Sequence, residues 1–281
     1  MLKELKKNPL TITRYINYFL KSSILKNNIV KEINGVKYEF DFNINSQSIK
    51  NIYFNTYGVD LIDIMETKLK NGDIFLDIGA NVGYISAIGA GLVGKSGQVH
   101  SFEPTPECAS YLEKVKALNP EYNIFVNSYA CSDQKGFSKL DVSASDIRLN
   151  TMVPNFLGKN NVKESIKVPV CRLDDYISEN GLRNITFIKI DTEGFELKVL
   201  KGLQKYFENT RSIDRPPIYC EIVPTVYPLL QLSLESLSNY MERYSYHAFD
   251  CRDISKKVDI IKLEKTTCVL FLPTVASIHK D

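Results

Sequence analysis

The sequence lacks long hydrophobic runs and any marked excess of charge. No stretch of 18 or more apolar residues occurs, so a membrane-spanning helix is not expected. The 35 basic and 33 acidic residues leave a net charge of +2, which gives no basis for predicting a nucleic-acid partner. The basic N-terminus has no apolar core before a small-residue cleavage site, so a secretory signal is not expected. Together these absences favour a cytoplasmic location.

Metal-binding and disulfide patterns are also missing. The three histidines lie far apart, and the six cysteines contain no C-x-x-C spacing, so no metal site is predicted. Several cysteines fall in apolar, strand-like runs. We therefore expect buried thiols in a reducing compartment rather than disulfides, for the cysteines Cys108, Cys131, Cys171, Cys220, Cys251 and Cys268.

The composition that remains is that of a globular protein. With 281 residues, 44% hydrophobic and 24% charged, the chain can form one large domain with an appended segment. We predict a helical and hairpin extension over 1–50 that packs on a main domain over 51–281. The basic amphipathic pattern of 1–26 favours docking on this domain, with peripheral contact to a membrane surface as the alternative. Val36–Phe42 alternates apolar and polar residues, which indicates a hairpin or edge strand.

The stretch 73–83 organises the rest of the sequence. Ile74–Ile78 is the length of a strand buried on both faces, and Asp77 interrupts it with a carboxylate that is costly to bury without a partner. Gly79 and Gly83 permit a sharp turn, and apolar residues at helical spacing follow them. This order of strand, glycine loop and helix is the first half of a nucleotide-binding βαβ unit.

The glycine spacing argues against a dinucleotide. In a G-x-G-x-x-G fingerprint that begins at Gly79, the second and third glycines are replaced by Asn81 and Tyr84. Asp77 suits a cationic amino-acid moiety, which S-adenosylmethionine carries. Glu103 follows Gly79 by 24 residues, at the end of the next expected strand, where an acid can accept hydrogen bonds from a ribose. The candidate cofactor-binding residues here are Asp77, Gly79, Ala80, Asn81, Gly83, Tyr84, Glu103 and Pro104.

Four segments together resemble the FkbM family of S-adenosylmethionine-dependent methyltransferases. They are Leu76-Asp-Ile-Gly-Ala-Asn-Val-Gly-Tyr-Ile-Ser86, Phe102-Glu-Pro-Thr-Pro106, Leu173-Asp-Asp175, and Ile188-Lys-Ile-Asp-Thr-Glu-Gly-Phe-Glu196 with Val199-Leu-Lys-Gly202. The resemblance covers roughly 70–222. It implies O-methylation, often of sugars or secondary metabolites, and hence a small-molecule or glycan acceptor. The flanks match nothing nameable, so the acceptor's identity is not predicted.

The expected fold is α/β: a Rossmann-like, mostly parallel twisted sheet with helices on both faces and an antiparallel edge strand. After the third strand, Ile124–Ala130, we expect Ser132 and Asp133 to border the adenine, although Asp133 is equally suited to a simple turn. The polar segment 143–165 is long for a loop, and we predict a mobile insertion near the substrate. The other expected helices and strands are Tyr53–Lys70, Thr105–Leu118, Ile166–Cys171, Leu173–Ile177, Leu234–Tyr244, Tyr246–Phe249, Asp259–Leu263 and Cys268–Leu272.

The candidate catalytic residues are carboxylates at the ends of the later strands. Lys189 and Asp191 share one face of the strand Phe187–Asp191, where Lys189 should be paired and should lower the pKa of nearby carboxylates. Glu193 opens the next helix, and Glu221 lies near the end of Ile218–Ile222. We predict that Asp191, Glu193 or Glu221 orients or deprotonates the acceptor, with Asp191 preferred.

Simpler alternatives are open at this point. Glu103 and Glu193 could only cap helix N-termini, which favour negative charge. A nicotinamide-dependent oxidoreductase would use the same fold, although the broken glycine fingerprint argues against it. A non-catalytic binding or scaffolding protein could also retain the cofactor fold.

Overall fold

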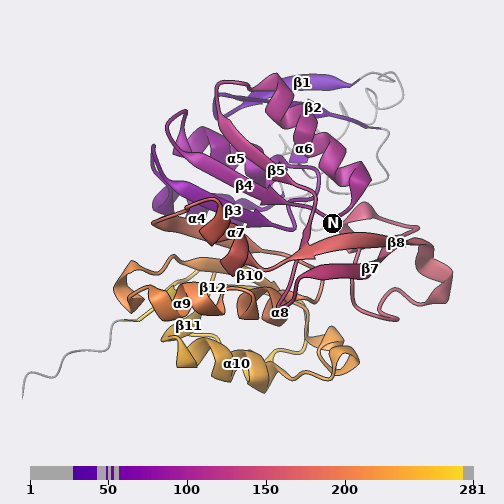
Figure 1. Cartoon of the computed structure of the whole chain (residues 1–281), viewed down its shortest axis with the longest axis vertical. Helices are drawn as coiled ribbons and strands as arrows, with labels where there is room; N and C mark the ends of the chain where they lie inside the picture. Colours follow the sequence, from indigo (N-terminus) through magenta and orange to yellow (C-terminus); the bar gives the residue numbers. More distant parts are fainter. Residues whose placement is uncertain (1–27, 43–48, 50–51, 54–56, 275–281) are drawn as a thin grey trace, which may run out of the picture.

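The computed structural model describes residues 28–42, 49, 52–53 and 57–274 (Figure 1). The helix predicted within 1–26, and with it the alternative of membrane contact, lies outside the described residues. No described helix is long and apolar enough to cross a membrane.

A seven-stranded sheet forms the centre of the molecule, in the order β11-β12-β10-β9-β3-β4-β5 (Figure 1). Five neighbouring strands are parallel, whereas β12 runs antiparallel between β10 and β11. The expected antiparallel strand is therefore present, but it lies one position inside the edge. The bounds are β3 Ile74–Ile78, β4 Gln98–Phe102, β5 Asn123–Asn127, β9 Ile185–Ile190, β10 Ile218–Ile222, β11 Tyr246–Asp250 and β12 Thr267–Pro273.

Helices cover both faces of this sheet, as the Rossmann-like prediction requires. Along β3, Phe75 packs in one core cluster while Leu76 and Ile78 pack in the other, because side chains alternate along a strand. The Phe75 side carries α4 Val59–Lys68, α5 Tyr84–Val93 and α6 Pro106–Leu118. The opposite side carries α7 Leu173–Glu179, α8 Glu196–Lys201, α9 Gln204–Asn209 and α10 Leu234–Arg243.

A β-hairpin lies against α5 and α6, where the sequence predicted a hairpin or edge strand (Figure 1). Its strands are β1 Ile29–Ile33 and β2 Val36–Phe40. Asn34 and Gly35 join them with φ angles of 50° and 81°, as a tight hairpin turn requires. The buried side chains of β2 belong to the same core cluster as those of α5.

Three predicted elements differ from the structure. A helix was expected over Tyr53–Lys70. In the structure α4 begins only at Val59, because Gly58 before it adopts a left-handed φ of 65°. The strand expected over Asp259–Leu263 is wrong. The segment is a 3-10 turn, since the Asp259 side chain accepts a hydrogen bond from the Ile261 N–H and turns the chain. The third strand ends at Asn127, and a separate short strand, β6 Ala130–Cys131, follows it.

A second sheet of three strands, β6-β8-β7, stands beside the main sheet (Figure 1). Strand β7 spans Gly136–Ser143 and β8 spans Val162–Cys171, so the predicted insertion 143–165 is the connection of an antiparallel pair and includes the start of β8. The described 3-10 turns are η1 Ile147–Leu149, η2 Lys159–Asn161, η3 Ser212–Asp214, η4 Pro224–Val226, η5 Pro228–Leu230 and η6 Ile260–Lys262.

Candidate functional site

A cavity of about 200 Å³ opens at the carboxyl ends of the parallel strands. Strand β3 has β4 on one side and β9 on the other, and this change of direction is where ligands of open α/β sheets bind. The cavity brings together seven of the residues predicted from the sequence, namely Gly79, Asn81, Glu103, Pro104, Asp191, Glu193 and Glu221.

The glycine loop after β3 is held between the two neighbouring strands. The N–H groups of Gly79 and Ala80 both donate to the Phe102 carbonyl at the end of β4, over 2.9 and 3.0 Å. Gly79 has a φ of 77°, and a Cβ there would lie 1.8 Å from the Asp191 carbonyl oxygen. Only glycine allows β3 and β9 to meet this closely at the cavity floor.

Asp77 and Lys189 form a buried pair behind this loop. The two residues are register partners on β3 and β9, with the Lys189 Nζ 3.2 Å from Asp77 Oδ1. Ser86 of α5 donates to the second oxygen of Asp77 over 2.6 Å, and Lys189 donates to the Gly79 carbonyl over 2.7 Å. Burial acts to lower the pKa of Lys189, but Asp77 and Asp191 outweigh it and raise this pKa. Asp77 is fully buried and acts on the loop through Lys189.

Glu103 is a buried carboxylate at the end of β4. One oxygen accepts from the Asn81 N–H over 2.9 Å and the other from the Thr105 N–H over 2.8 Å. Burial raises the pKa of Glu103, and these hydrogen bonds oppose the rise. Each carboxylate oxygen has a second lone pair, so Glu103 can still accept from a ligand hydroxyl.

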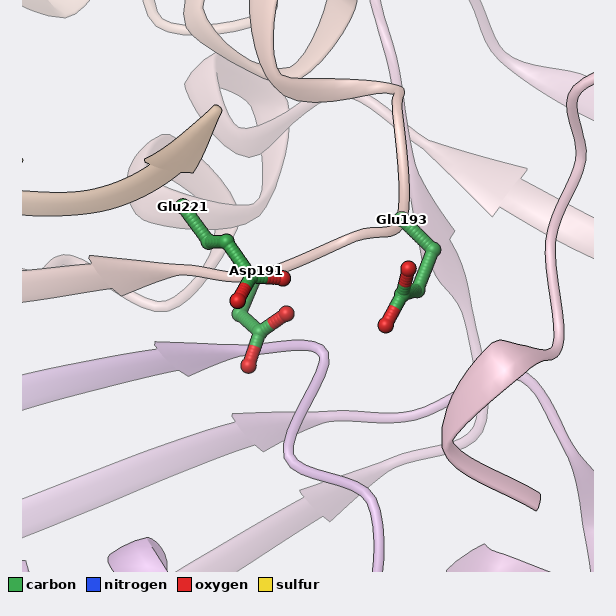
Figure 2. A group of neighbouring side chains, drawn as sticks. All are labelled: Asp191, Glu193 and Glu221. Carbon is green, nitrogen blue, oxygen red and sulfur yellow. The ribbon is translucent and has the colours of Figure 1, made fainter. Parts of the chain in front are cut away.

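The side chains of three residues lie close together, with one carboxyl oxygen of each within 4.8 Å of the others: Asp191, Glu193 and Glu221 (Figure 2). The Asp191 carboxylate also lies 3.5 Å from the Lys189 Nζ. Proximity to Asp191, together with burial, raises the pKa of Glu221 to about 10. Burial, with a contribution from Asp191, raises the pKa of Glu193 to about 8. Near neutral pH this cluster therefore holds protons at Glu193 and Glu221.

Six predicted cofactor residues, including the buried Asp77, are not part of this cavity's lining. Ala80 in the loop and Tyr84 at the start of α5 are buried, and Gly83 packs on Leu112. The Ser132 hydroxyl donates to Asp133 over 3.0 Å. Ser132 and Asp133 do not line the cavity, so their expected contact with the adenine stays a prediction.

Sequence reasoning missed part of the lining. Tyr57 reaches the cavity from the segment before α4, and no motif or residue spacing in the sequence indicates that it is a site residue. Ile147–Asn150 enters this cavity from the predicted insertion, and the placement of the insertion near the substrate stays a prediction. Tyr129–Cys131 follows the third strand, so the rule that places ligands at strand ends could have identified it.

The donors and acceptors of the cavity fit a hydroxylated, positively charged ligand. Four carboxyl groups line it, and the one arginine among its described lining residues, Arg148, forms an ion pair of 2.8 Å with Asp146. A pyrophosphate would meet negative charge here. Glu103 suits ribose hydroxyls, and Phe102 and Leu140 offer apolar surface for a base. These residues fit S-adenosylmethionine.

The chain matches the family described as Methyltransferase FkbM domain over residues 77–247. It is 28% identical over 162 residues to the 31-O-demethyl-FK506 methyltransferase FkbM of Streptomyces tacrolimicus, covering 49% of this chain and 62% of that protein. It is 22% identical over 195 residues to the hexuronic acid methyltransferase AglP of Haloferax volcanii, covering 69% of this chain and 76% of that protein. The chain thus spans less than two thirds of the first of these relatives. Among solved structures, Aeropyrum pernix fibrillarin with bound S-adenosylmethionine aligns with a TM-score of 0.43 and 12% identity, over 88% of this chain and 82% of that one.

Proposed function

The chain belongs to the methyltransferase FkbM domain family, and from this premise we propose that it methylates a hydroxyl oxygen of a sugar or another small metabolite. The family match confirms the expected methyltransferase class, with S-adenosylmethionine as cofactor. The observation that carries the proposal is the convergence of Glu103, the Gly79 loop and the Asp191 cluster in one cavity.

The cofactor would supply an electrophilic methyl group on a positively charged sulfur. In our proposal Glu103 accepts hydrogen bonds from the ribose, and the backbone from Gly79 to Asn81 lies against the cofactor. Asp191 and Glu103 line the same cavity and provide carboxyl oxygens that favour its positive charge. Asp77 contributes indirectly, because it holds Lys189 on the Gly79 carbonyl.

The acceptor hydroxyl needs a group that takes its proton. Asp191 is our choice because its carboxyl lies 3.5 Å from the Lys189 ammonium. Glu193 and Glu221 have pKa values raised to about 8 and about 10, so near neutral pH they are protonated and donate hydrogen bonds instead. The role we assign to them is to orient the acceptor oxygen toward Asp191.

The names of two relatives support an oxygen acceptor. One acts on 31-O-demethyl-FK506 and the other on a hexuronic acid. Both acceptors carry hydroxyl groups. The cluster of this chain contains Asp191 as its proposed base, and a carboxylate is suited to remove a hydroxyl proton during transfer.

Thermal unfolding with S-adenosylmethionine, its demethylated product and NAD separates the proposal from the oxidoreductase alternative. We expect the first two ligands to raise Tm and NAD to leave it unchanged, since a ligand that binds the folded state stabilises it. Release of a radiolabelled methyl group onto hydroxylated acceptors then separates catalysis from mere cofactor binding. Stabilisation by NAD alone would contradict the proposal.

A further inference from the structure

A second cavity, of about 440 Å³, adjoins the first. Its wall comes from the start of α4, from β10, and from residues near the two C-terminal strands, and includes Asp60, Tyr219, Arg252 and Cys268. Its volume falls in the range of small-molecule sites, about 300–1,000 Å³.

The two cavities meet at the candidate catalytic residues. Tyr57, Asp191 and Glu221 line both of them. The glycine loop and Glu103 line only the first cavity, and Asp60 and Arg252 line only the second. A ligand in each cavity would therefore bring its reactive end to Asp191, which satisfies the requirement that donor and acceptor atoms approach closely in a fixed orientation.

We propose that the second cavity binds the methyl acceptor and that the acceptor is a sugar ring or a similar polyol, an inference that rests on the methyl transfer proposed above. The hydroxyl that is methylated lies at Asp191 and Glu221. The remaining hydroxyls extend toward Asp60 and Arg252.

The chemistry of the wall supports this class of acceptor. Arg252 Nε lies 2.8 Å from Asp60 Oδ2, and both side chains are accessible, at 81% and 38% exposure. The pair places a hydrogen-bond donor beside an acceptor, which matches two neighbouring hydroxyls of a sugar. It also joins the first turn of α4 to the residues that follow β11, at the outer part of the cavity.

Tyr57 lines both cavities and offers its phenol to a ligand there. Burial raises the pKa of Tyr57 well above its usual value, and Asp191 and Glu221 add to the rise, so the phenol remains a hydrogen-bond donor. Such a donor near the Asp191 and Glu221 carboxyl groups favours an oxygen-rich ligand over an apolar one. Tyr57 also contacts the Tyr84 ring, with centroids 6.1 Å apart, which fixes its position beside α5.

A blocking substitution tests the location. Val59 lines the second cavity only and is 46% exposed, so Val59→Trp fills it from the solvent side. Val30 on β1 is 50% exposed and lies outside both cavities, which makes Val30→Trp the matched control. The probes are methyl glycosides of hexoses and of hexuronic acids, with catechol as a non-sugar hydroxyl, and tritiated S-adenosylmethionine as donor.

We expect transfer to at least one methyl glycoside and none to catechol. Val59→Trp should lower kcat/KM for the glycoside about tenfold or more, with the Kd for S-adenosylmethionine unchanged, and Val30→Trp should change neither. Asp60→Ala and Arg252→Ala should raise the glycoside KM about tenfold with a smaller change in kcat, because they remove binding contacts distant from the reacting oxygen.

The outcomes distinguish this inference from the function on which it rests. Failure of the unsubstituted protein to bind S-adenosylmethionine would contradict the function itself. Binding of S-adenosylmethionine with transfer to catechol alone, or to no glycoside, overturns the acceptor class. Glycoside methylation that survives Val59→Trp at full rate overturns the location.

Discussion

Lys189 and Asp77 are register partners on adjacent parallel strands, and their side chains form an ion pair of 3.2 Å at 4% and 0% exposure. Taking both charges out of water is costly, so the pair persists only because each partner compensates the other. The Lys189 ammonium also reaches the Gly79 carbonyl and Asp191. One buried cation thus connects the core of the sheet, the cofactor loop and the proposed base.

Removing this cation should destabilise the fold strongly. We expect Lys189→Met to lower the free energy of unfolding by about 3–5 kcal/mol, because it leaves Asp77 charged and buried without a partner. The double variant Lys189→Met/Asp77→Asn should recover much of that loss. Urea unfolding measures both. The control is Lys262→Met, which removes a surface lysine that is 83% exposed and should change stability little. A double variant no more stable than the single one would contradict the compensation.

Glu103 should contribute to cofactor affinity. Glu103→Ala removes the carboxylate proposed to hold the ribose, and the Kd for S-adenosylmethionine should weaken by about 1.5–3 kcal/mol, the usual range for hydrogen bonds to a charged group. Calorimetry gives the value, and Glu107→Ala, an exposed position in the first turn of α6, is the matched control. Unchanged affinity in a folded Glu103→Ala protein would falsify the ribose role.

The parallel core was predictable because its signals are local. A short apolar run followed by glycines predicted β3 and the start of α5. Short apolar runs of the same kind predicted β4, β9 and β10. The convergence of Asp191 and Glu221 follows from a general rule, since carboxyl ends of parallel strands meet at one edge.

The rest depends on contacts between distant segments. Tyr57 enters the site only through the packing of the segment before α4, and no periodicity in the sequence indicates it. The sequence around Asp259 is compatible with both a strand and a turn. The hydrogen bond from the Ile261 N–H to the Asp259 side chain stabilises the turn. The sequence suggested that Asp77 contacts the ligand, because it did not show which residue neutralises this buried carboxylate. The structure shows that Lys189 of β9 does so.

Asp191 should be required for transfer. Asp191→Asn keeps the shape but removes the basic oxygen, so single-turnover methyl transfer should slow by on the order of 100-fold or more, with a much smaller change in cofactor Kd. Asp63→Asn on the exposed face of α4 serves as the control. Transfer at the normal rate would assign Asp191 a structural role. A defect that disappears at saturating cofactor would instead place it in the cofactor site.

Glu196 should make stability depend on pH. It is fully buried, its Oε2 has no hydrogen-bond partner among the described residues, and burial raises its pKa to about 8. A carboxyl with a raised folded-state pKa contributes stability that is present below its usual pKa and is lost as pH rises to the folded value. Between pH 5 and pH 8 the native protein should therefore lose on the order of 3–4 kcal/mol relative to Glu196→Gln, since this range spans about three pH units and one unit is about 1.4 kcal/mol. Glu193 titrates in both proteins, so their difference in urea unfolding isolates Glu196; equal pH slopes would contradict the prediction.

The connection between β7 and β8 should become ordered when the cofactor binds. It contacts the loop and α6 through long hydrogen bonds, from Asn81 Nδ2 to the Ile147 carbonyl at 3.4 Å and from Asn150 Nδ2 to Thr105 Oγ1 at 3.3 Å. Bonds of this length are weak, so these two contacts can open at low cost, although the Ala144 N–H donates to the Asn161 carbonyl over 2.8 Å and Ile147 is buried. Ile147 and Leu149 also line the cofactor cavity.

Hydrogen exchange should show this change directly. The amides of 144–150 should exchange rapidly in the free protein and become protected with the demethylated cofactor, as expected of a segment that closes over a ligand. The amides of Val162–Cys171 serve as an internal control, because β8 pairs with β7 along its length and should stay protected in both states. Strong protection of 144–150 without any ligand would rule out a closing segment, and the cavity would then be preformed on that side.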